Sequence, residues 1–199
     1  MQNQVKLFPG KSRLNRHGFF LGFCGALSVG IAPDREGIRM PKSEQVEVES
    51  DFALNFLSSK LADFIGYLQE KKGGRDFPAR ADIAPREMQQ WLPMISMYDV
   101  PAQGEEFRIR LMGTALGELL ASGNLHGQPI SALPPLVYER KLQALNSVLS
   151  TRAPLRTFVE RTVIPGQDFQ SIEACYVPLS GNGTDINVII ALMQLGARP

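Results

Sequence analysis

Chemically reactive side chains are scarce in this chain. Its 199 residues include only two histidines and two cysteines, and Cys24 and Cys175 lie far apart in dissimilar contexts. Such a pair predicts neither a disulfide framework nor a metal site, and it favours a reducing, cytoplasmic setting. No Gly-x-Ser-x-Gly elbow, phosphate-binding loop or metal-ligand cluster occurs in the sequence. We therefore expect no catalytic, cofactor-binding or metal-binding residues and a protein that is not an enzyme.

An excess of charge of one sign is also absent. The chain has 21 Lys and Arg against 20 Asp and Glu, a formal net charge of +1. Binding to nucleic acid would need a strongly basic face, so we expect no nucleic-acid partner. A hydrophobic content of 44% with 21% charged residues is typical of a globular protein, and the length suffices for one domain of ordinary size.

Residues 1–39 differ from the rest of the chain. Several basic residues precede a mostly apolar run at 18–32, the layout of a secretory signal peptide. The run is shorter than the roughly 20 residues of a transmembrane helix, and we expect no membrane partner. From Met40 the sequence Met-Pro-Lys-Ser-Glu-Gln is polar, as is usual at the N-terminus of a protein. We expect 1–39 to be a poorly ordered extension or misassigned start, with an export signal or a membrane-associating tail as alternatives.

The segment 40–74 is predicted to hold an N-terminal amphipathic helix over residues 50–72. Apolar residues recur there at spacings of three and four, and Lys71-Lys-Gly-Gly74 ends the helix. This apolar stripe either covers part of the core or pairs with a second copy of the chain, and the two roles are compatible. The candidate interface residues are Leu57, Leu61, Phe64 and Leu68.

Residues 75–199 are predicted to form an α+β domain. A proline-anchored lead-in from Arg75, expected to dock the N-terminal helix onto the sheet, precedes the regular elements. Those elements are a short helix at 85–92, strands at 94–100 and 107–111, a short helix at 113–120, a long helix at 134–151 and strands at 155–164, 169–179 and 186–195. The last strand is almost continuously apolar, which predicts a central position covered on both faces.

Several separated sequence blocks carry a resemblance over about 52–195. They are Phe77-Pro-Ala-Arg80, Asp82-Ile-Ala-Pro85, Leu92-Pro93, Asp99-Val100, Phe107-Arg-Ile-Arg-Leu-Met-Gly-Thr114 and Gly127. In these blocks, and in the order of its elements, the chain resembles a bacterial PAS-like family formerly catalogued as a domain of unknown function. The resemblance implies a PAS-like five-stranded antiparallel sheet with short helices and one long helix on one face. It also implies a role in signal transduction or regulation.

The sequence lacks the chemistry of better-known PAS domains. Haem-binding members supply a histidine from the long helix, and residues 136–145 contain none. Light-sensing flavin members need a reactive cysteine in an Asn-Cys-Arg motif near the short helices, where this chain has Asn124-Leu-His126. We expect no haem and no flavin adduct, and we expect Cys175 to be a buried, small hydrophobic residue.

Two classes of function remain. The first is a single-domain PAS-like regulatory module that binds a protein partner, a second copy through its N-terminal helix, or a small ligand between sheet and helices. The alternative is an enzyme of uncertain type that uses the same cavity. In the strand at 107–111, Phe107, Ile109 and Leu111 are expected to share one buried face. The residues expected either to line the cavity or to pack in the core are Leu111, Leu119, Leu142, Ile172 and Ile190.

Overall fold

The computed structural model describes residues 48–101, 105–120, 122–123, 125–162, 164 and 170–196. All of them belong to one compact unit that spans 42–199. The expectations for residues 1–39 lie outside the described residues, and the domain boundary proposed at residue 39 stays a prediction.

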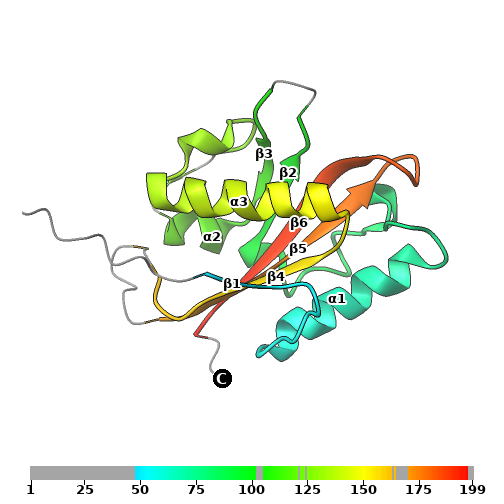
Figure 1. Ribbon diagram of the computed structural model, residues 1–199, viewed down its shortest axis with the longest axis horizontal. Coiled ribbons are helices and arrows are strands. Elements are labelled where there is room, and N and C mark those ends of the chain that lie inside the picture. The colour runs from blue at the N-terminus through cyan, green and yellow to red at the C-terminus, as the bar shows by residue number, and fades with distance from the viewer. Residues whose placement is uncertain are drawn as a thin grey trace, which may run out of the picture. The chain divides into compact units, whose positions relative to one another are not determined.

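The described strands form one antiparallel sheet in the order β1-β4-β5-β6-β2-β3 (Figure 1). Their bounds are β1 Glu49–Asp51, β2 Ile95–Asp99, β3 Arg108–Met112, β4 Leu155–Val159, β5 Ile172–Ser180 and β6 Ile186–Leu195. The apolar β6 pairs with β5 on one side and β2 on the other, which confirms its predicted central position. The α+β class and the five predicted strands are confirmed, and β1 is an added edge strand paired with β4.

Three α-helices accompany the sheet in the described part of the chain. They are α1 (Ser59–Lys72), α2 (Thr114–Leu119) and α3 (Pro135–Thr151), with 3₁₀ turns η1 (Arg80–Asp82), η2 (Leu92–Met94) and η3 (Ile130–Ala132). The predicted helix at 85–92 is instead a series of turns closed by hydrogen bonds such as Met88 N–H to Pro85 O, followed by η2. Most of these hydrogen bonds join residues three apart, as in turns, rather than four apart, as in an α-helix.

The predicted start of the first helix at residue 50 is wrong, because the helix begins at Ser59. Residues before it first form β1 and then an irregular segment in which Leu54 has a φ of 60°. This left-handed conformation cannot be part of an α-helix. The Asp51 carboxylate accepts the backbone N–H groups of Ala53 and Asn55, which stabilises the turn away from the strand.

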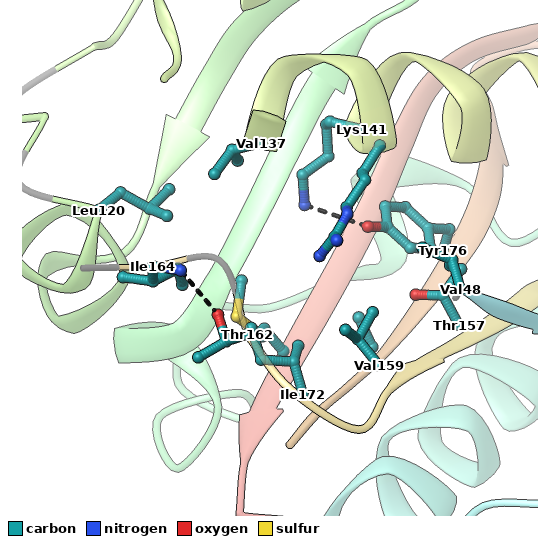
Figure 2. A pocket seen from close by; sticks show the side chains of 13 residues that line it. Val48, Leu120, Val137, Lys141, Thr157, Val159, Thr162, Ile164, Ile172 and Tyr176 are labelled. Atoms are coloured by element: carbon teal, nitrogen blue, oxygen red, sulfur yellow. Dashed lines mark hydrogen bonds between the residues drawn. The ribbon is translucent and has the colours of Figure 1, made fainter. Parts of the chain in front are cut away.

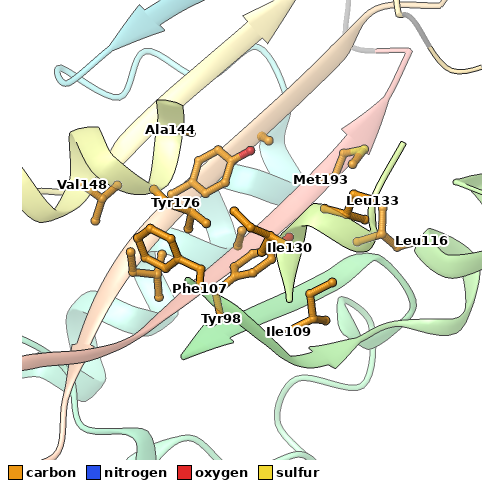
Figure 3. Close-up of a cluster of buried hydrophobic side chains, with 14 of the residues drawn as sticks. Tyr98, Phe107, Ile109, Leu116, Ile130, Leu133, Ala144, Val148, Tyr176 and Met193 are labelled. Atoms are coloured by element: carbon orange, nitrogen blue, oxygen red, sulfur yellow. The ribbon is translucent and has the colours of Figure 1, made fainter. Parts of the chain in front are cut away.

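Both faces of the sheet are covered. On one face α2 and α3 pack over sheet residues such as Tyr98, Tyr176 and Met193 (Figure 3). On the other face α1 packs over Met97, Cys175 and the alternate residues of the same strands. Side chains alternate between faces along a strand, so β5 and β6 contribute to both hydrophobic cores. Their near-continuous apolar sequences follow from this double burial.

The lead-in segment docks α1 onto the sheet, as the sequence predicts. Trp91 packs edge-to-face against Phe64 with ring centroids 5.3 Å apart, and it also contacts Tyr67 of α1. The Glu87 carboxylate forms an ion pair with Lys71 Nζ at 2.7 Å and accepts a hydrogen bond from the Tyr67 hydroxyl. Each of these lead-in residues contacts α1 through its side chain, so this proline-rich segment serves packing.

A β-bulge in β3 changes the face to which Leu111 points. Tyr98 pairs with Ile109 and Met97 with Leu111, so Arg110 is the extra residue between the two pairs. The inserted residue reverses the alternation beyond it. Ile109 therefore lies in the α3-side core, whereas Leu111 packs against the α1-side core. The expectation that Phe107, Ile109 and Leu111 share one face is wrong for Leu111.

Candidate ligand cavity between α3 and the sheet

The face of α3 that meets the sheet carries a charged residue at its centre. The helix starts at Pro135, which suits its first turn. Val137, Lys141 and Ala144 recur at spacings of four and three and therefore lie on one face. The buried residues of the helix are Lys141, Ala144, Leu145 and Val148. A lysine thus occupies a position that the helix periodicity assigns to the core.

A cavity of about 70 Å³ lies beneath this face of α3. Figure 2 shows Lys141 reaching from α3 to the Tyr176 hydroxyl of β5, with Val137 of the same helix on the side of Leu120. The apolar lining residues are Val48, Leu120, Val137, Val159, Ile164, Ile172, Ala174 and Met193. The polar lining residues are Arg140, Lys141, Thr157, Thr162 and Tyr176. The cavity is partly open to solvent, and its walls are mainly aliphatic.

Lys141 is buried, with 5% of its surface exposed. Its Nζ donates a hydrogen bond of 3.1 Å to the Tyr176 hydroxyl and lies 5.0 Å from the centre of that ring and 5.5 Å from the Tyr98 ring. Such cation–π contacts stabilise an ammonium group where water is excluded. Among the described residues no carboxylate forms an ion pair with Lys141. Its charge is thus held by aromatic and hydroxyl groups alone.

Burial and neighbouring groups change the pKa values of Lys141 and Arg140, the two cationic residues of the lining. Burial alone lowers the pKa of Lys141, but the electrostatic effect of the Tyr176 and Tyr98 phenols and the hydrogen bond to Tyr176 outweigh it and raise the pKa above its ordinary value. Partial burial lowers the pKa of Arg140, yet guanidinium groups stay protonated in proteins. Both groups are therefore positively charged at neutral pH.

The five residues predicted to line one cavity are divided between the two faces of the sheet. Ile172 lines the cavity, and Leu119 and Leu142 pack against the α3-side core without lining it. Leu111 and Ile190 lie in the α1-side core, so placing them in this cavity is wrong. The bulge redirects Leu111. Ile190 lies in an almost continuously apolar strand, where composition does not indicate which residues face which helix.

The residues that sequence reasoning missed are Lys141, Arg140 and Tyr176. The signal in the sequence was a lysine inside the buried stripe that runs through Val137, Ala144 and Val148. The periodicity of the helix indicates a buried face with Tyr138, Leu142, Leu145 and Leu149, of which Leu145 is fully buried and the other three are partly buried. Tyr176 gives no separate signal, because aromatic residues are common in strands.

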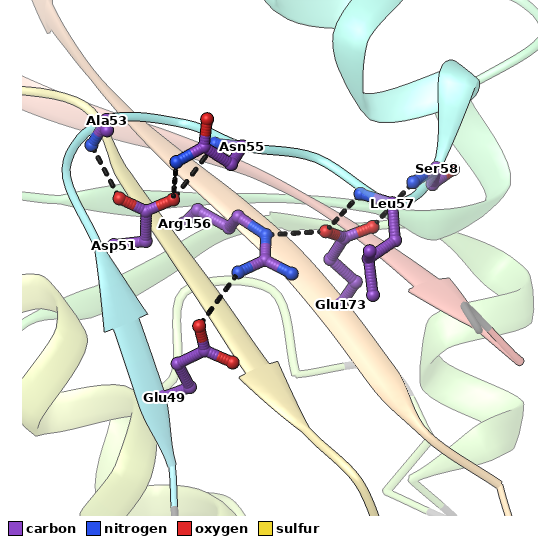
Figure 4. Close-up of polar contacts among 8 residues, drawn as sticks. All are labelled: Glu49, Asp51, Ala53, Asn55, Leu57, Ser58, Arg156 and Glu173. Atoms are coloured by element: carbon purple, nitrogen blue, oxygen red, sulfur yellow. Dashed lines mark hydrogen bonds and ion pairs between the residues drawn. The ribbon is translucent and has the colours of Figure 1, made fainter. Parts of the chain in front are cut away.

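On the opposite face, a buried ion pair connects β4 and β5 to the start of α1 (Figure 4). Glu173 is fully buried, and its carboxylate accepts the N–H groups of Leu57 and Ser58, each at 2.8 Å. The Arg156 Nε–H donates a hydrogen bond of 2.6 Å to Glu173 Oε1, and the Arg156 Nη1 lies 3.7 Å from Oε1 of Glu49 in β1. Since Ser58 is the N-cap of α1, the Glu173 charge lies at the positive end of the helix.

Three of the four candidate interface residues on the N-terminal helix belong to the domain's own core. Leu61 and Phe64 are fully buried and Leu68 is 1% exposed, all against the α1-side face of the sheet. Only Leu57, at 40% exposure, is accessible. The sheet thus already covers Leu61, Phe64 and Leu68 in this structure, and the contact of this stripe with a second copy stays a prediction.

Cys175 lies in β5 among the α1-side core residues. Burial raises the pKa of its thiol to about 12. At neutral pH the group is therefore a neutral thiol, and the reactive thiolate is suppressed. Within the described residues no group of three or more His, Cys, Asp or Glu side chains could hold a metal ion. No helix in that part of the chain is long and apolar enough to cross a membrane.

Comparison with known families identifies the class of protein that this fold defines. The family model of the PAS domain matches residues 57–193. The chain therefore belongs to the PAS domain family, whose members are in general sensory and signalling modules, and the resemblance inferred from the sequence is confirmed. The match begins after β1, so the edge strand lies outside it.

A search of solved structures finds a similar chain in a structure of an RNA-binding light-oxygen-voltage receptor. The two chains share 15% sequence identity with a TM-score of 0.39, over 57% of this chain and 33% of the receptor chain. The chain thus spans about a third of the length of that receptor chain. A search of curated proteins finds no match.

Proposed function

We propose that this PAS domain senses a small molecule that binds in the cavity between α3 and the sheet. One observation carries the proposal: β4 and β5 line the cavity with one face and hold the start of α1 with the other. Binding in the cavity is then coupled to the N-terminal segment through two strands that contact both. We also propose that it acts in the cytoplasm, in keeping with its few cysteines.

The coupling follows from the alternation of side chains along the two strands. Thr157 of β4 and Ala174 of β5 face the cavity and are directly paired, as are Arg156 with Cys175 and Phe158 with Glu173. A ligand that shifts β4 relative to β5 changes the geometry between Arg156 and Glu173. Since Glu173 holds the N–H groups of Leu57 and Ser58, this shift alters the start of α1.

A protein partner is expected at this same end of α1. Phe52 and Leu57 are 48% and 40% exposed, and both belong to the segment between β1 and α1. Large hydrophobic side chains at an exposed, adjustable junction suit a contact that responds to the state of the cavity. Pairing of two copies through Leu61, Phe64 and Leu68 has no support, since α1 buries these residues against its own sheet.

The enzymatic alternative has little support from the cavity. Nucleophilic or acid–base catalysis needs a group that exchanges a proton near neutral pH or attacks in its neutral form. Lys141 is held protonated, and the other described polar residues of the lining are Arg140, Thr157, Thr162 and Tyr176. This set suits recognition of a ligand better than its chemical conversion.

Native mass spectrometry of the full chain, followed by ligand-observed NMR with a set of small fragments, tests the sensing proposal. We expect a bound small molecule that is lost in Ala174→Leu, because the added atoms fill the cavity. The matched control is Ala62→Leu, which adds the same side chain on an exposed part of α1. A chain that retains no molecule and binds no fragment would contradict the proposal.

A further inference from the structure

The cavity carries positive charge that the described part of the protein leaves unbalanced. Lys141 and Arg140 both line it, and neither forms an ion pair with any described carboxylate. Ammonium groups are costly to bury without a partner, and lysine is seldom fully buried unless paired. Two adjacent cations on one wall therefore indicate that the partner is supplied by something that enters the cavity.

A second polar group near the ammonium lacks a partner. The Tyr98 hydroxyl is buried with no hydrogen-bond partner, and the Tyr98 ring lies within 5.5 Å of Lys141 Nζ. Buried hydroxyl groups are normally hydrogen-bonded, and an exception calls for an explanation. Lys141 itself has three donors, of which one is used by Tyr176. Tyr98 lies behind the lining residues, so the unused donors that face the cavity are those of Lys141 itself.

The walls restrict the chemistry of the partner. Eight of the thirteen lining residues are aliphatic or Met, and the hydroxyl groups are those of Thr157 in β4, Tyr176 in β5 and Thr162 beyond the end of β4 (Figure 2). A phosphate carries polar oxygens on every side, and aliphatic walls would leave several of them without donors. A group with a charged head and an apolar tail satisfies both the cations and the walls. A carboxylate on a short aliphatic chain has this form.

The size of the cavity limits the length of that chain. About 70 Å³ is available, several times the roughly 10–15 Å³ that one water occupies, so the space suits a ligand of only a few non-hydrogen atoms. Butyrate, a carboxylate with three further carbons, has a matching number of non-hydrogen atoms. Longer acids would have to extend through the open side of the cavity.

We infer that the ligand is a small aliphatic monocarboxylate, bound with its carboxylate against Lys141 and Arg140 and its hydrocarbon chain against Val159, Ile172 and Met193. This inference rests on the proposed sensing function and specifies its ligand class. Lys141 supplies a buried point charge, and Arg140 supplies a planar fork that matches a carboxylate. The aliphatic wall excludes water from the pair and strengthens it.

Isothermal titration calorimetry of the full chain with butyrate, butyramide and 1-butanol tests the inference, since the three probes share the chain and differ in the charge of the head. We expect butyrate to bind roughly tenfold or more tightly than either neutral probe, as one charge-assisted hydrogen bond is worth this much. Lys141→Met keeps the length of the side chain and removes the charge. We expect it to abolish the preference, and Arg140→Gln to reduce it.

The control for charge removal is Lys60→Met, on the exposed side of α1, which should bind butyrate as the unmodified chain does. If all three probes bind alike and Lys141→Met changes nothing, the ligand class is wrong and the sensing function stands. If no probe binds while uncharged fragments of other shapes occupy the cavity, the class is again wrong. If nothing binds at all, sensing by this cavity fails as well. Should Lys141→Met not fold, an unchanged preference in Arg140→Gln would overturn the two-cation site.

Discussion

Lys141 illustrates at the scale of one residue how a buried charge affects stability. The ammonium gains cation–π contacts and one hydrogen bond but gives up its hydration. Replacing a buried charge with a hydrophobic group of similar size is often neutral or stabilising. We expect Lys141→Met to leave the free energy of unfolding unchanged or to raise it by about 1 kcal/mol in urea denaturation. A loss of stability, with Lys60→Met unchanged, would show that the charge is structural.

The two tyrosines beside Lys141 are expected to respond differently to loss of their hydroxyl groups. Tyr176 accepts a hydrogen bond from the ammonium, whereas the Tyr98 hydroxyl has no partner. Tyr176→Phe removes a bond to a charged group and should lower the free energy of unfolding by about 1.5–3 kcal/mol. Tyr98→Phe removes an unsatisfied buried group and should be neutral or slightly stabilising. Equal losses in both variants, measured by denaturation, would contradict this assignment.

Individual site residues were the least predictable part of the protein. Periodicity indicated that α3 has a buried face, but it could not indicate that Lys141 at its centre is retained as a charge. That property depends on Tyr176, which is distant in sequence and reaches Lys141 only through the fold. Leu111 was misplaced by a single inserted residue in β3, and a bulge of this kind has no reliable sequence signal.

At the scale of elements, Glu173 holds α1 to the sheet. Its carboxylate is fully buried and accepts two backbone N–H groups and the Arg156 Nε. Glu173→Gln leaves Arg156 buried without a strong partner, and breaking such a pair typically costs 3–5 kcal/mol, so we expect a loss of about 3 kcal/mol. Glu49→Gln is the matched control.

Glu49 contacts the same arginine but is 66% exposed, at 3.7 Å. Exposed ion pairs contribute about 0–1 kcal/mol, so Glu49→Gln should change stability by less than about 1 kcal/mol. Denaturation of both variants, with hydrogen exchange to locate the effect at the start of α1, checks the difference. Similar losses in the two variants would show that the cap on α1 contributes little.

The connection between β3 and α2 depends on a close approach of two backbones at Gly113. A Cβ there would lie 2.2 Å from the Leu92 carbonyl oxygen and 2.4 Å from that of Pro93, so the backbone would have to move. We expect Gly113→Ala to lower the free energy of unfolding by more than about 2 kcal/mol, in the range of overpacked cores.

Gly66 in α1 is the control, because an added Cβ there meets nothing within 4 Å. Gly66→Ala should stabilise the protein by about 0.5–1 kcal/mol through helix propensity. Thermal or urea denaturation compares the two. A mild effect at Gly113 would mean that η2 shifts to accommodate the methyl group.

The order and type of the main elements were predictable, whereas their ends were not. Alternation and 3.6-residue periodicity located five strands, α2 and α3, because each buries a face with a regular pattern. β1 has the sequence Glu-Ser-Asp, and only its pairing with β4 makes it a strand. The start of α1 shifted from residue 50 to Ser59 because Glu173, more than 100 residues away, supplies its cap.

At the scale of the whole molecule, the sheet lies between a cavity under α3 and a helix whose start is held by the opposite face. The same two strands, β4 and β5, line the cavity with one face and contact the start of α1 with the other, as the proposed coupling requires. Sequence resemblance indicated the PAS family and the central β6. It gave no indication that α1 and α3 lie on opposite faces, since the near-continuous burial of β5 and β6 conceals which residues face each helix.

The last prediction concerns transmission across the sheet. Butyrate is expected to change hydrogen exchange at residues 57–62, because a shift of β4 against β5 alters the hydrogen bonds from Leu57 and Ser58 to Glu173. In Glu173→Gln, butyrate should still bind, since this residue does not line the cavity, but the response of α1 should be lost. Glu49→Gln should respond as the unmodified chain does. Hydrogen exchange measured by mass spectrometry, with and without butyrate, checks all three proteins. An α1 response that persists in Glu173→Gln would show that the signal leaves the cavity by another route, and bound butyrate with no change at 57–62 in the unmodified chain would show that α1 receives none.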